Sequence, residues 1–555
     1  LRINGKTDGG TGDLSTQVLL GQIPALARPG ARRALVIGLA TGISAAAVAS
    51  HGVPEVDVVD ICPEVVDACR IFEPINGGLL RRPGVRVVVE DGRTHVEHAR
   101  GTYDIIVTEP TNPWIAGVSN LFTREYFEAC RDRLSGDGVV CVWLQSYGIS
   151  REDFAMTVRT VRSVFPRVTV WEAMPYVDFI LLASKDPAAD LPAVIAGRPF
   201  PGGEAGASLA LGGIGSREAL LATLALGEEA AAAFAGEGPL HTDDRLQLEF
   251  RTPRGAFGDR GYEPFRADAM DGILDASPIL AHARDPADFA ALEAAIGARK
   301  RIREGTGWFK RTDQPLVRER FRDLLEREPG TLLDLCRDLP EPLRERAEAV
   351  ARELGPSSLD GDLMAHLQWV KAIRLLEEAI RASPGDLMAG RRLAECLLTR
   401  ASDSLQRGDA RSAAADLLRA LRLRPGDGAL LRAMARTHAL AAGEDPSSPH
   451  VAEGLRFFDA ALAVNPRFEM ALVEKGALLA AVGRDPEAEA AFRRALEVRP
   501  DSVAGIVNLA RLLQVGGRNA EAAALVERGL AIEEGYGPLR DLRRDLERGG
   551  APPGR

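Results

Sequence analysis

The stretch that decides the fold of the N-terminal region is Val36-Ile-Gly-Leu-Ala-Thr-Gly42, in which an apolar run meets two glycines. The apolar run before Gly38 is typical of a strand that is buried on both faces, and the sequence after Gly42 is typical of a helix. Glycines at such a turn allow a tight bend and a close approach of the backbone to a ligand. The stretch therefore predicts the first turn of a βαβ unit, with a ligand-binding loop.

Short apolar runs alternate with helical patterns from Arg33 to Lys185, which predicts a doubly wound, Rossmann-like α/β domain. The expected sheet has the seven strands of class I methyltransferase-type folds, at Ala34–Ile37, Val56–Ile61, Val85–Val89, Tyr103–Thr108, Val139–Leu144, Val168–Trp171 and Phe179–Ala183. Helices are predicted at Pro63–Phe72, Thr123–Leu134 and Arg151–Val164, and around Glu218–Ala235.

Residues at the ends of three predicted strands are suited to holding a nucleoside. Asp60 lies at the end of the second strand, where a carboxylate can accept hydrogen bonds from both ribose hydroxyls. Asp91-Gly92 follows the third strand, where an acidic side chain can reach the adenine amino group. Glu109 ends the fourth strand at the edge where open α/β sheets bind ligands, and it is placed to meet a reacting group. The alternatives are a helix N-terminal charge for Asp60, a plain turn for Asp91-Gly92 and a solvated strand-end charge for Glu109.

A second region, from about residue 361 to 545, repeats a spacing of a small residue, a large residue, a small residue and a proline. One copy is Ala488, Phe492, Ala495 and Pro500; the others begin at Ala372, Ala413 and Gly454, and a fifth copy, at Ala522, lacks the proline. Small residues let two helices approach, the large residue fills the groove, and proline ends the second helix. The spacing predicts an all-α solenoid of paired helices, and it resembles that of tetratricopeptide repeats. The resemblance implies a protein or peptide partner.

Composition narrows the classes of partner. The chain of 555 residues carries 79 acidic and 69 basic residues, a balance that argues against nucleic-acid binding. The six cysteines and eight histidines show no metal-ligand spacing, so no metal site is predicted. No apolar run is long enough to span a membrane, and no signal peptide is visible, so a cytoplasmic location is expected. Because the chain begins at Leu1, an upstream portion is expected, and a tether of that portion to the inner face of a membrane is left open.

The N-terminal motifs together resemble those of the polyamine aminopropyltransferase (spermidine synthase) family over roughly residues 1–185. The similar stretches are Ile3-Asn4-Gly5 with Gly12–Gln17, Leu35–Gly42, Asp60-Ile61-Cys62, Asp91-Gly92, Tyr103–Phe127, Gln145 and Pro175-Tyr176. Thr242-Asp243-Asp244 resembles the tail of bacterial chains that join such a domain to transporter-like helices.

This resemblance implies transfer of an aminopropyl group from decarboxylated S-adenosylmethionine, a co-substrate, to an amine such as putrescine. It implies that Glu109 binds the ammonium group and takes its proton. The implied cofactor-binding residues are Gln17, Gly38, Gly42, Asp60, Ile61, Asp91 and Gly92, and the implied substrate-binding residues are Asn112, Gln145 and Tyr176. Asn112 stands where the family has a second acidic residue, and Thr16-Gln17-Val18 replaces a Tyr-His-Glu stretch, so weaker recognition of a diamine is expected.

Two other functions stay open: a methyltransferase that uses intact S-adenosylmethionine, and a non-catalytic nucleoside-binding scaffold. Self-association into a homo-oligomer is also left open. The predicted organisation is an N-terminal stub at residues 1–32, the transferase domain at 33–260, a helical connector at 261–360, the repeat array at 361–545 and a disordered tail at 546–555.

Overall fold

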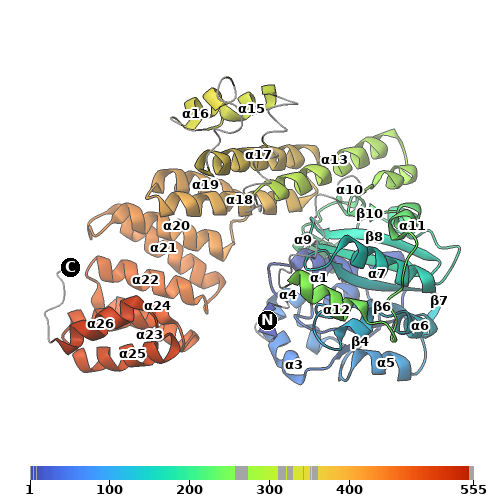
Figure 1. The fold of residues 1–555 in the computed structure, drawn as a ribbon, viewed down its shortest axis with the longest axis horizontal. Coiled ribbons are helices and arrows are strands. Elements are labelled where there is room, and N and C mark those ends of the chain that lie inside the picture. The colour runs from blue at the N-terminus through green and yellow to red at the C-terminus, as the bar shows by residue number, and fades with distance from the viewer. Residues whose placement is uncertain are drawn as a thin grey trace. The chain divides into compact units, whose positions relative to one another are not determined.

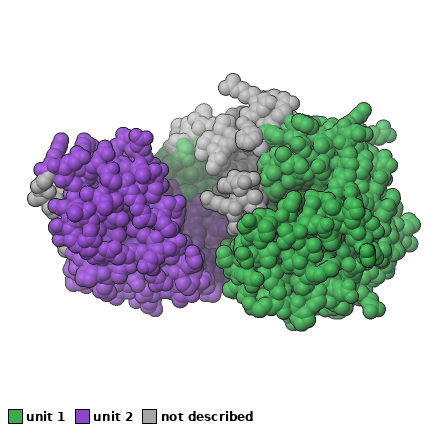
Figure 2. Space-filling view, turned by 90° about the horizontal axis from the view of Figure 1, so that it is seen from below, with its two compact units in different colours: residues 1–392 green, residues 393–555 purple. Residues whose placement is uncertain are grey.

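The computed structural model describes residues 2–3, 6–7, 9–256, 273–309, 321, 329–339, 341, 343–350, 352 and 361–548. The chain forms two compact units, Leu1–Arg392 and Leu393–Arg555, which Figure 2 colours separately. The predicted turn at Asn4-Gly5, much of the predicted connector and residues 549–555 of the predicted tail lie outside the described residues. The predicted domain limits therefore stay predictions.

An eight-stranded sheet forms the centre of the first unit (Figure 1). Its strands are β3 (Arg33–Ile37), β4 (Glu55–Asp60), β5 (Val85–Val89), β6 (Tyr103–Thr108), β7 (Leu134–Gln145), β8 (Arg167–Met174), β9 (Asp178–Ser184) and β10 (Leu224–Leu226), in the order β10-β8-β9-β7-β6-β3-β4-β5. The five strands from β7 to β5 are parallel to one another. On the other side of β7, β9 pairs antiparallel with β7, β8 with β9 and β10 with β8. The chain thus has the doubly wound sheet that the apolar runs predict.

The strand count differs from the prediction because Leu224–Leu226 forms an eighth strand. The sequence around it predicts one helix, but the structure has α10 (Arg217–Leu221), then β10, then α11 (Glu228–Ala235). All three residues of β10 are buried, and β10 pairs with β8 and forms the edge of the sheet. A three-residue apolar run carries no readable periodicity, so only pairing with β8 identifies it as a strand.

Helices cover both faces of the sheet and create two hydrophobic cores. Val36 of β3 packs in the core that includes α1 (Leu14–Ala27) and α2 (Ile43–Ala49). Its neighbour Leu35 packs in the core that includes α6 (Arg124–Arg133) and α7 (Arg151–Val164). Alternate residues of a strand point to opposite faces, so a strand covered on both sides must be apolar throughout.

The remaining elements of the first unit are short strands, helices and 3-10 turns. They are β1 (Arg2–Ile3), β2 (Lys6–Thr7), α3 (Pro63–Cys69), η1 (Arg70–Phe72), α4 (Glu73–Asn76), η2 (Leu79–Arg81), α5 (Gly92–His98), η3 (Val118–Phe122), α8 (Leu191–Ala196), α9 (Gly203–Leu211), α12 (Gln247–Ala256), η5 (Ser277–His282), α13 (Pro286–Phe309), α15 (Pro329–Cys336), α16 (Leu343–Ala349) and α17 (Gly361–Ala382). The helix α1, which no motif predicted, is buried from Ser15 to Ala27 and so lacks the polar face that reveals a helix in sequence.

The C-terminal region is helical. After α18 (Leu387–Gln406), its helices are α19 (Ala410–Leu423), α20 (Gly428–Ala442), α21 (Pro449–Val464), α22 (Glu469–Ala481), α23 (Asp485–Val498), α24 (Val503–Val515), α25 (Asn519–Ile532) and α26 (Gly537–Glu547). From α19 to α26 each helix packs on the next, and α22 also contacts α24. None of the helices in the described ranges combines the length and apolar character needed to cross a membrane.

Candidate active site

A cavity of about 820 Å³ lies at the carboxyl edge of the parallel strands of the first unit. Its lining includes residues at the carboxyl ends of four of these strands: Gly38 after β3, Asp60 at the end of β4, Asp91 two residues after β5 and Glu109 after β6. In open α/β sheets this edge is the place where ligands bind. The cavity is therefore the candidate active site.

The turn after β3 needs glycine at Gly38 for two reasons. Gly38 has φ +98°, and a Cβ atom added there would lie 2.5 Å from the carbonyl oxygen of Glu109. Its N–H donates to the carbonyl of Val59 at 2.8 Å, which holds the turn against the adjacent strand. The backbone is thus fixed close to the cavity, where a ligand can approach it. Gly42 caps α2 with φ +77° and does not line the cavity.

The Asp60 carboxylate organises the loops on both sides of it. One oxygen accepts the N–H of Leu39 and the other accepts the N–H of Cys62, each at 2.9 Å. Asp60 and its neighbour Ile61, whose side chain is 70% exposed, both line the cavity. Asp60 therefore ties the glycine-containing turn to the loop after β4 at the place predicted for the ribose.

Asp91 and Gly92 lie where β5 joins α5. Asp91 caps the helix by accepting the N–H of Thr94 at 2.8 Å, and a Cβ atom on Gly92 would lie 2.4 Å from Cγ2 of Ile37. Both residues line the cavity. The pair forms a turn and also faces the predicted nucleoside pocket, so the two interpretations of its sequence are compatible.

Glu109 is half-buried at the cavity, and its carboxyl pKa is raised to about 8. Removal from bulk water is the largest cause, and the negative charges of Asp13 and Asp178 raise it further. The Ser44 hydroxyl donates to Glu109 at 2.6 Å and opposes this rise by stabilising the carboxylate. A carboxyl group with this pKa gains or loses its proton near neutral pH.

Two acidic residues that lie at the cavity, Asp13 and Asp178, were not among the predicted site residues, although Asp13 belongs to the similar stretch Gly12–Gln17. Asp13 accepts from the N–H of Gly10 at 3.1 Å and from Nε2 of Gln17 at 2.8 Å, and burial raises its pKa. Asp178 accepts from the hydroxyl of Thr16 at 2.7 Å and from Nε1 of Trp143 at 3.1 Å.

The signal that identifies Asp178 is the direction of its strand. Asp178 begins β9, which runs antiparallel to β7 and pairs Asp178 with Gln145 at the end of β7. The amino end of β9 therefore falls on the same edge as the carboxyl ends of the parallel strands. A sequence-based interpretation that treats every strand as parallel misses this residue.

Four predicted site residues lie beside the cavity without lining it: Gln17, Asn112, Gln145 and Tyr176. Gln17 accepts from the Thr41 hydroxyl and donates to Asp13. Asn112 is buried and donates to the Tyr147 hydroxyl at 3.4 Å. The amide of Gln145 is buried without a hydrogen-bond partner among the described residues. Tyr176 has φ +62° and its N–H donates to Glu172 at 3.1 Å. Their roles in binding stay predictions.

The cavity is strongly acidic. Asp13, Asp60, Asp91, Glu109 and Asp178 line it, and Arg93 is the only basic side chain among the described lining residues. Arg93 is already engaged, since it donates twice to Asp243, at 2.8 and 2.6 Å, and once to Glu97 at 2.9 Å. Within the described ranges, no three His, Cys, Asp or Glu side chains gather as a metal-ion site.

Comparison with known proteins places this site in context. Residues 14–178 match the spermine/spermidine synthase domain. The polyamine aminopropyltransferase of Clostridium botulinum (strain Eklund 17B / Type B) is 31% identical over 119 residues, which are 21% of this chain and 42% of that protein. The polyamine aminopropyltransferase of Pyrobaculum calidifontis is 31% identical over 156 residues, which are 27% of this chain and 54% of that protein. The chain thus spans about half the length of the curated relatives it matches.

Solved structures of the same kind are also similar. A spermidine synthase in complex with the transition state analogue AdoDATO is 24% identical and covers 32% of this chain and 63% of its own, with a TM-score of 0.30. The spermidine synthase from Thermotoga maritima is 24% identical, with a TM-score of 0.29.

Fold and site together define an open α/β domain with an acidic ligand cavity at the carboxyl edge of its sheet. By the match of residues 14–178, this part of the chain is similar to the spermine/spermidine synthase domain.

Proposed function

We propose that the α/β domain moves an aminopropyl group from decarboxylated S-adenosylmethionine to an amine acceptor such as putrescine. One observation carries the proposal: a single cavity is lined by Gly38, Asp60 and Asp91 and also by Glu109, with the carboxylates of Asp13 and Asp178 near Glu109. The first three suit a nucleoside, and the acidic group suits a cationic amine.

In this proposal Glu109 accepts the proton of the acceptor amine. The amine nitrogen forms a bond to the aminopropyl carbon next to sulfur, and the carbon–sulfur bond breaks with its electrons left on sulfur. Methylthioadenosine leaves as a neutral thioether, and the proton lost by the amine passes to Glu109. A general base acts best when its pKa lies near the working pH, and the Glu109 pKa of about 8 meets that condition.

Asp13 and Asp178 supply acidic groups that were not among the predicted site residues. Asn112 and Thr16-Gln17-Val18 remove carboxylates from the family pattern, and on this ground a weaker amine site was expected. The two aspartates increase the negative charge near Glu109, as its raised pKa reflects. A bound ammonium group would relieve this repulsion and lower the Glu109 pKa. The cavity's charge therefore supports a cationic acceptor.

The state of Arg93 favours a decarboxylated donor over intact S-adenosylmethionine. A methyltransferase needs a cation or backbone N–H groups to bind the carboxylate of its donor. Arg93 is the only basic side chain in the described lining, and its charge is neutralised by Asp243 and Glu97. The methyltransferase and the non-catalytic scaffold remain the alternatives that an experiment must separate.

Calorimetric titration of the full chain with methylthioadenosine, decarboxylated S-adenosylmethionine and S-adenosylhomocysteine separates the three functions. The proposal expects binding of the first two and weak binding of the third. Tighter binding of S-adenosylhomocysteine would favour methyl transfer, and binding of none of the three would contradict both enzymatic functions.

The acceptor site is tested by titrating putrescine into the protein saturated with methylthioadenosine. Glu109→Gln should weaken putrescine binding at least about tenfold, the loss of one charge-assisted contact, while methylthioadenosine still binds. Glu128→Gln is the matched control, because Glu128 pairs with Arg124 and does not line the cavity. Equal putrescine affinity in wild type and Glu109→Gln would exclude Glu109 from the acceptor site.

We further propose that residues 361–545 form a tetratricopeptide-type array that binds a protein or peptide. In support, the small and large residues of the repeat spacing are buried between helices, as Ala488, Phe492 and Ala495 illustrate. Arg432 of α20 pairs with Glu474 of α22 at 3.1 Å, which links the first helices of successive pairs.

Peptides selected from a random library on the full chain test the array. They should lose binding when the half-exposed Arg436, beside Glu474, is changed to Glu. Failure to select any peptide, or equal binding by Arg436→Glu, would contradict the proposal.

A further inference from the structure

The segment of residues 239–249 lies outside the matched residues 14–178, yet it reaches the wall of the cavity. It contains the Thr242-Asp243-Asp244 motif, which the proposed reaction does not use. Its contacts fall into two groups, one on α7 and one on the wall of the cavity, at Arg93 and at Ser119 between two lining residues.

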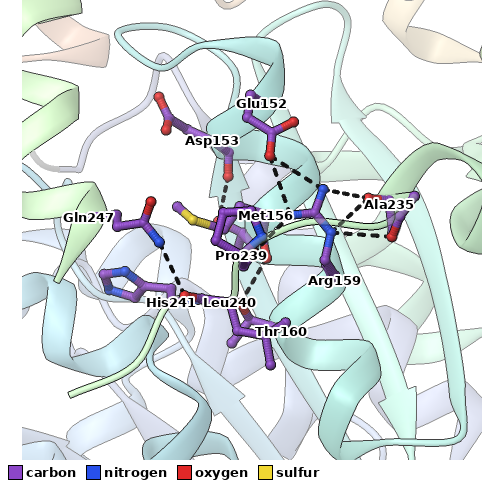
Figure 3. Close-up of polar contacts among 12 residues, drawn as sticks. Glu152, Asp153, Met156, Arg159, Thr160, Ala235, Pro239, Leu240, His241 and Gln247 are labelled. Atoms are coloured by element: carbon purple, nitrogen blue, oxygen red, sulfur yellow. Dashed lines mark hydrogen bonds and ion pairs between the residues drawn. The ribbon is translucent and has the colours of Figure 1, made fainter. Parts of the chain in front are cut away.

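The beginning of the segment is anchored on α7 by Arg159 and Thr160 (Figure 3). The guanidinium group of Arg159, which is 9% exposed, donates to the carbonyl of Ala235 at 2.9 and 2.7 Å and to that of Pro239 at 2.8 Å. The hydroxyl of Thr160 accepts the N–H of His241 at 3.0 Å. These bonds fix the chain before it turns toward the cavity, since charge-assisted bonds of a buried arginine are strong.

Two side chains of the segment hold Ser119, which lies in η3. The ring nitrogen Nε2 of His241 donates to the carbonyl of Ser119 at 3.0 Å, and the Ser119 hydroxyl donates to Glu249 at 2.9 Å. Burial lowers the His241 pKa, which keeps the ring neutral and suited to one donated and one accepted bond. Ser119 is itself fully buried, while its neighbours Val118 and Asn120 line the cavity.

A third side chain, Asp243, holds Arg93 on the other part of the wall. The carboxylate accepts hydrogen bonds from both terminal nitrogens of Arg93, at 2.8 and 2.6 Å, a bidentate arrangement with defined direction. The N–H of Asp243 donates to Glu125 at 3.0 Å, which fixes the aspartate at the start of α6. Arg93 follows Asp91-Gly92 and lines the cavity with them.

We propose that residues 239–249 act as a clasp that positions two parts of the cavity wall, η3 through Ser119 and the turn after β5 through Arg93. Asp243, His241 and Glu249 are positioning residues, because they act on the ligand through other residues. The clasp sets the affinity of the cavity for a nucleoside and keeps the charge of Arg93 neutralised. Only the identity of the ligand rests on the proposed function.

Hydrogen exchange of the full chain without ligand tests the clasp first. Asp243→Asn should speed exchange in residues 92–96, and Glu249→Gln should speed exchange in residues 115–122, each by about tenfold, the effect of weakening a local structure by one charge-assisted bond. Asp416→Asn is the matched control, since Asp416 accepts two bonds from Arg400, at 2.7 and 2.6 Å, in the other unit. Unchanged exchange in residues 92–96 in Asp243→Asn, or in residues 115–122 in Glu249→Gln, would overturn the proposal.

Ligand binding supplies the second test. Asp243→Asn should weaken methylthioadenosine binding by about five- to tenfold, and Asp243→Glu, which keeps the carboxylate, should recover most of that affinity. If the clasp acts through Arg93, the variant that combines Asp243→Asn with Arg93→Gln binds no worse than Arg93→Gln alone. Fully additive losses, or a loss equal to that of Asp416→Asn, would contradict the assigned role. If wild type binds no methylthioadenosine, the proposed function fails, while the exchange experiment still decides on the clasp.

Discussion

The carboxyl group of Glu109 should make the stability of the first unit depend on pH in a way that Glu109→Gln removes. The environment at the cavity raises its pKa from 4.5 to about 8. Between these values the folded protein holds a proton that the unfolded chain releases. The stabilising effect is therefore complete below about pH 4.5, declines as pH rises and is absent above about pH 8.

The pKa rise limits the size of this effect. A difference of about 3.5 pKa units at about 1.4 kcal/mol each gives an upper limit of about 5 kcal/mol. Glu109 faces the cavity and is only half-buried, so solvent screening reduces the expected value to about 2–3 kcal/mol. Glutamine keeps the size of the side chain and its contact with Ser44 but has no proton to lose.

Tryptophan emission during urea unfolding measures this difference in the first unit alone. All five tryptophans, Trp114, Trp143, Trp171, Trp308 and Trp369, lie within Leu1–Arg392. Between pH 5 and pH 8.5, wild type should lose about 2–3 kcal/mol relative to Glu109→Gln. Glu128→Gln, which removes a carboxylate that pairs with Arg124, should follow wild type. Parallel pH profiles for wild type and Glu109→Gln would show that Glu109 does not hold a proton in the folded protein near neutral pH.

Three further substitutions test the packing around the site and in the helical region. Gly38→Ala should weaken methylthioadenosine binding at least about tenfold, because its Cβ would meet the Glu109 carbonyl. The control is Gly30→Ala, which has φ +74° and no atom within 4 Å of the added Cβ, and so shares only the backbone strain of about 1–3 kcal/mol. Equal affinities of the two variants in calorimetry would refute the role of this contact. Glu172→Gln should lower the unfolding free energy of the first unit by about 3 kcal/mol. The buried guanidinium groups of Arg299 and Arg303, which lie 3.6 and 3.4 Å from the Glu172 carboxylate, would lose a full partner charge. An unchanged unfolding midpoint, followed by tryptophan emission, would contradict this. Ala495→Leu should destabilise the second unit by about 1–3 kcal/mol, measured by circular dichroism, and leave the unfolding followed by tryptophan emission unchanged. Ala441→Leu, at an exposed position, should change neither measurement. Equal effects of the two variants would show that the repeat spacing does not mark close helix contacts.

The order of elements in the sheet was readable from the sequence because buried strands and covering helices differ in their apolar patterns. Each of the seven predicted strands exists, with ends that differ by a few residues, as β7 shows by extending from Leu134 to Gln145. The strand β10 and the helix α1 were missed for opposite reasons. One has three residues and no period, and the other is apolar almost all round and has no polar face.

The sequence by itself determined the residues at the carboxyl ends of the parallel strands, Gly38, Asp60, Asp91 and Glu109, because a strand end is a local property. The repeat spacing is also a local property, so the sequence determined it as well. Only the tertiary structure decided which distant residues join them. Asp178 reaches the cavity because β9 is antiparallel, and Asp243 meets Arg93 across 150 residues of chain. The direction of a strand, and the place where a segment late in the chain packs, depend on which surfaces bury one another. The two surfaces lie far apart in the chain, so no window of sequence contains both.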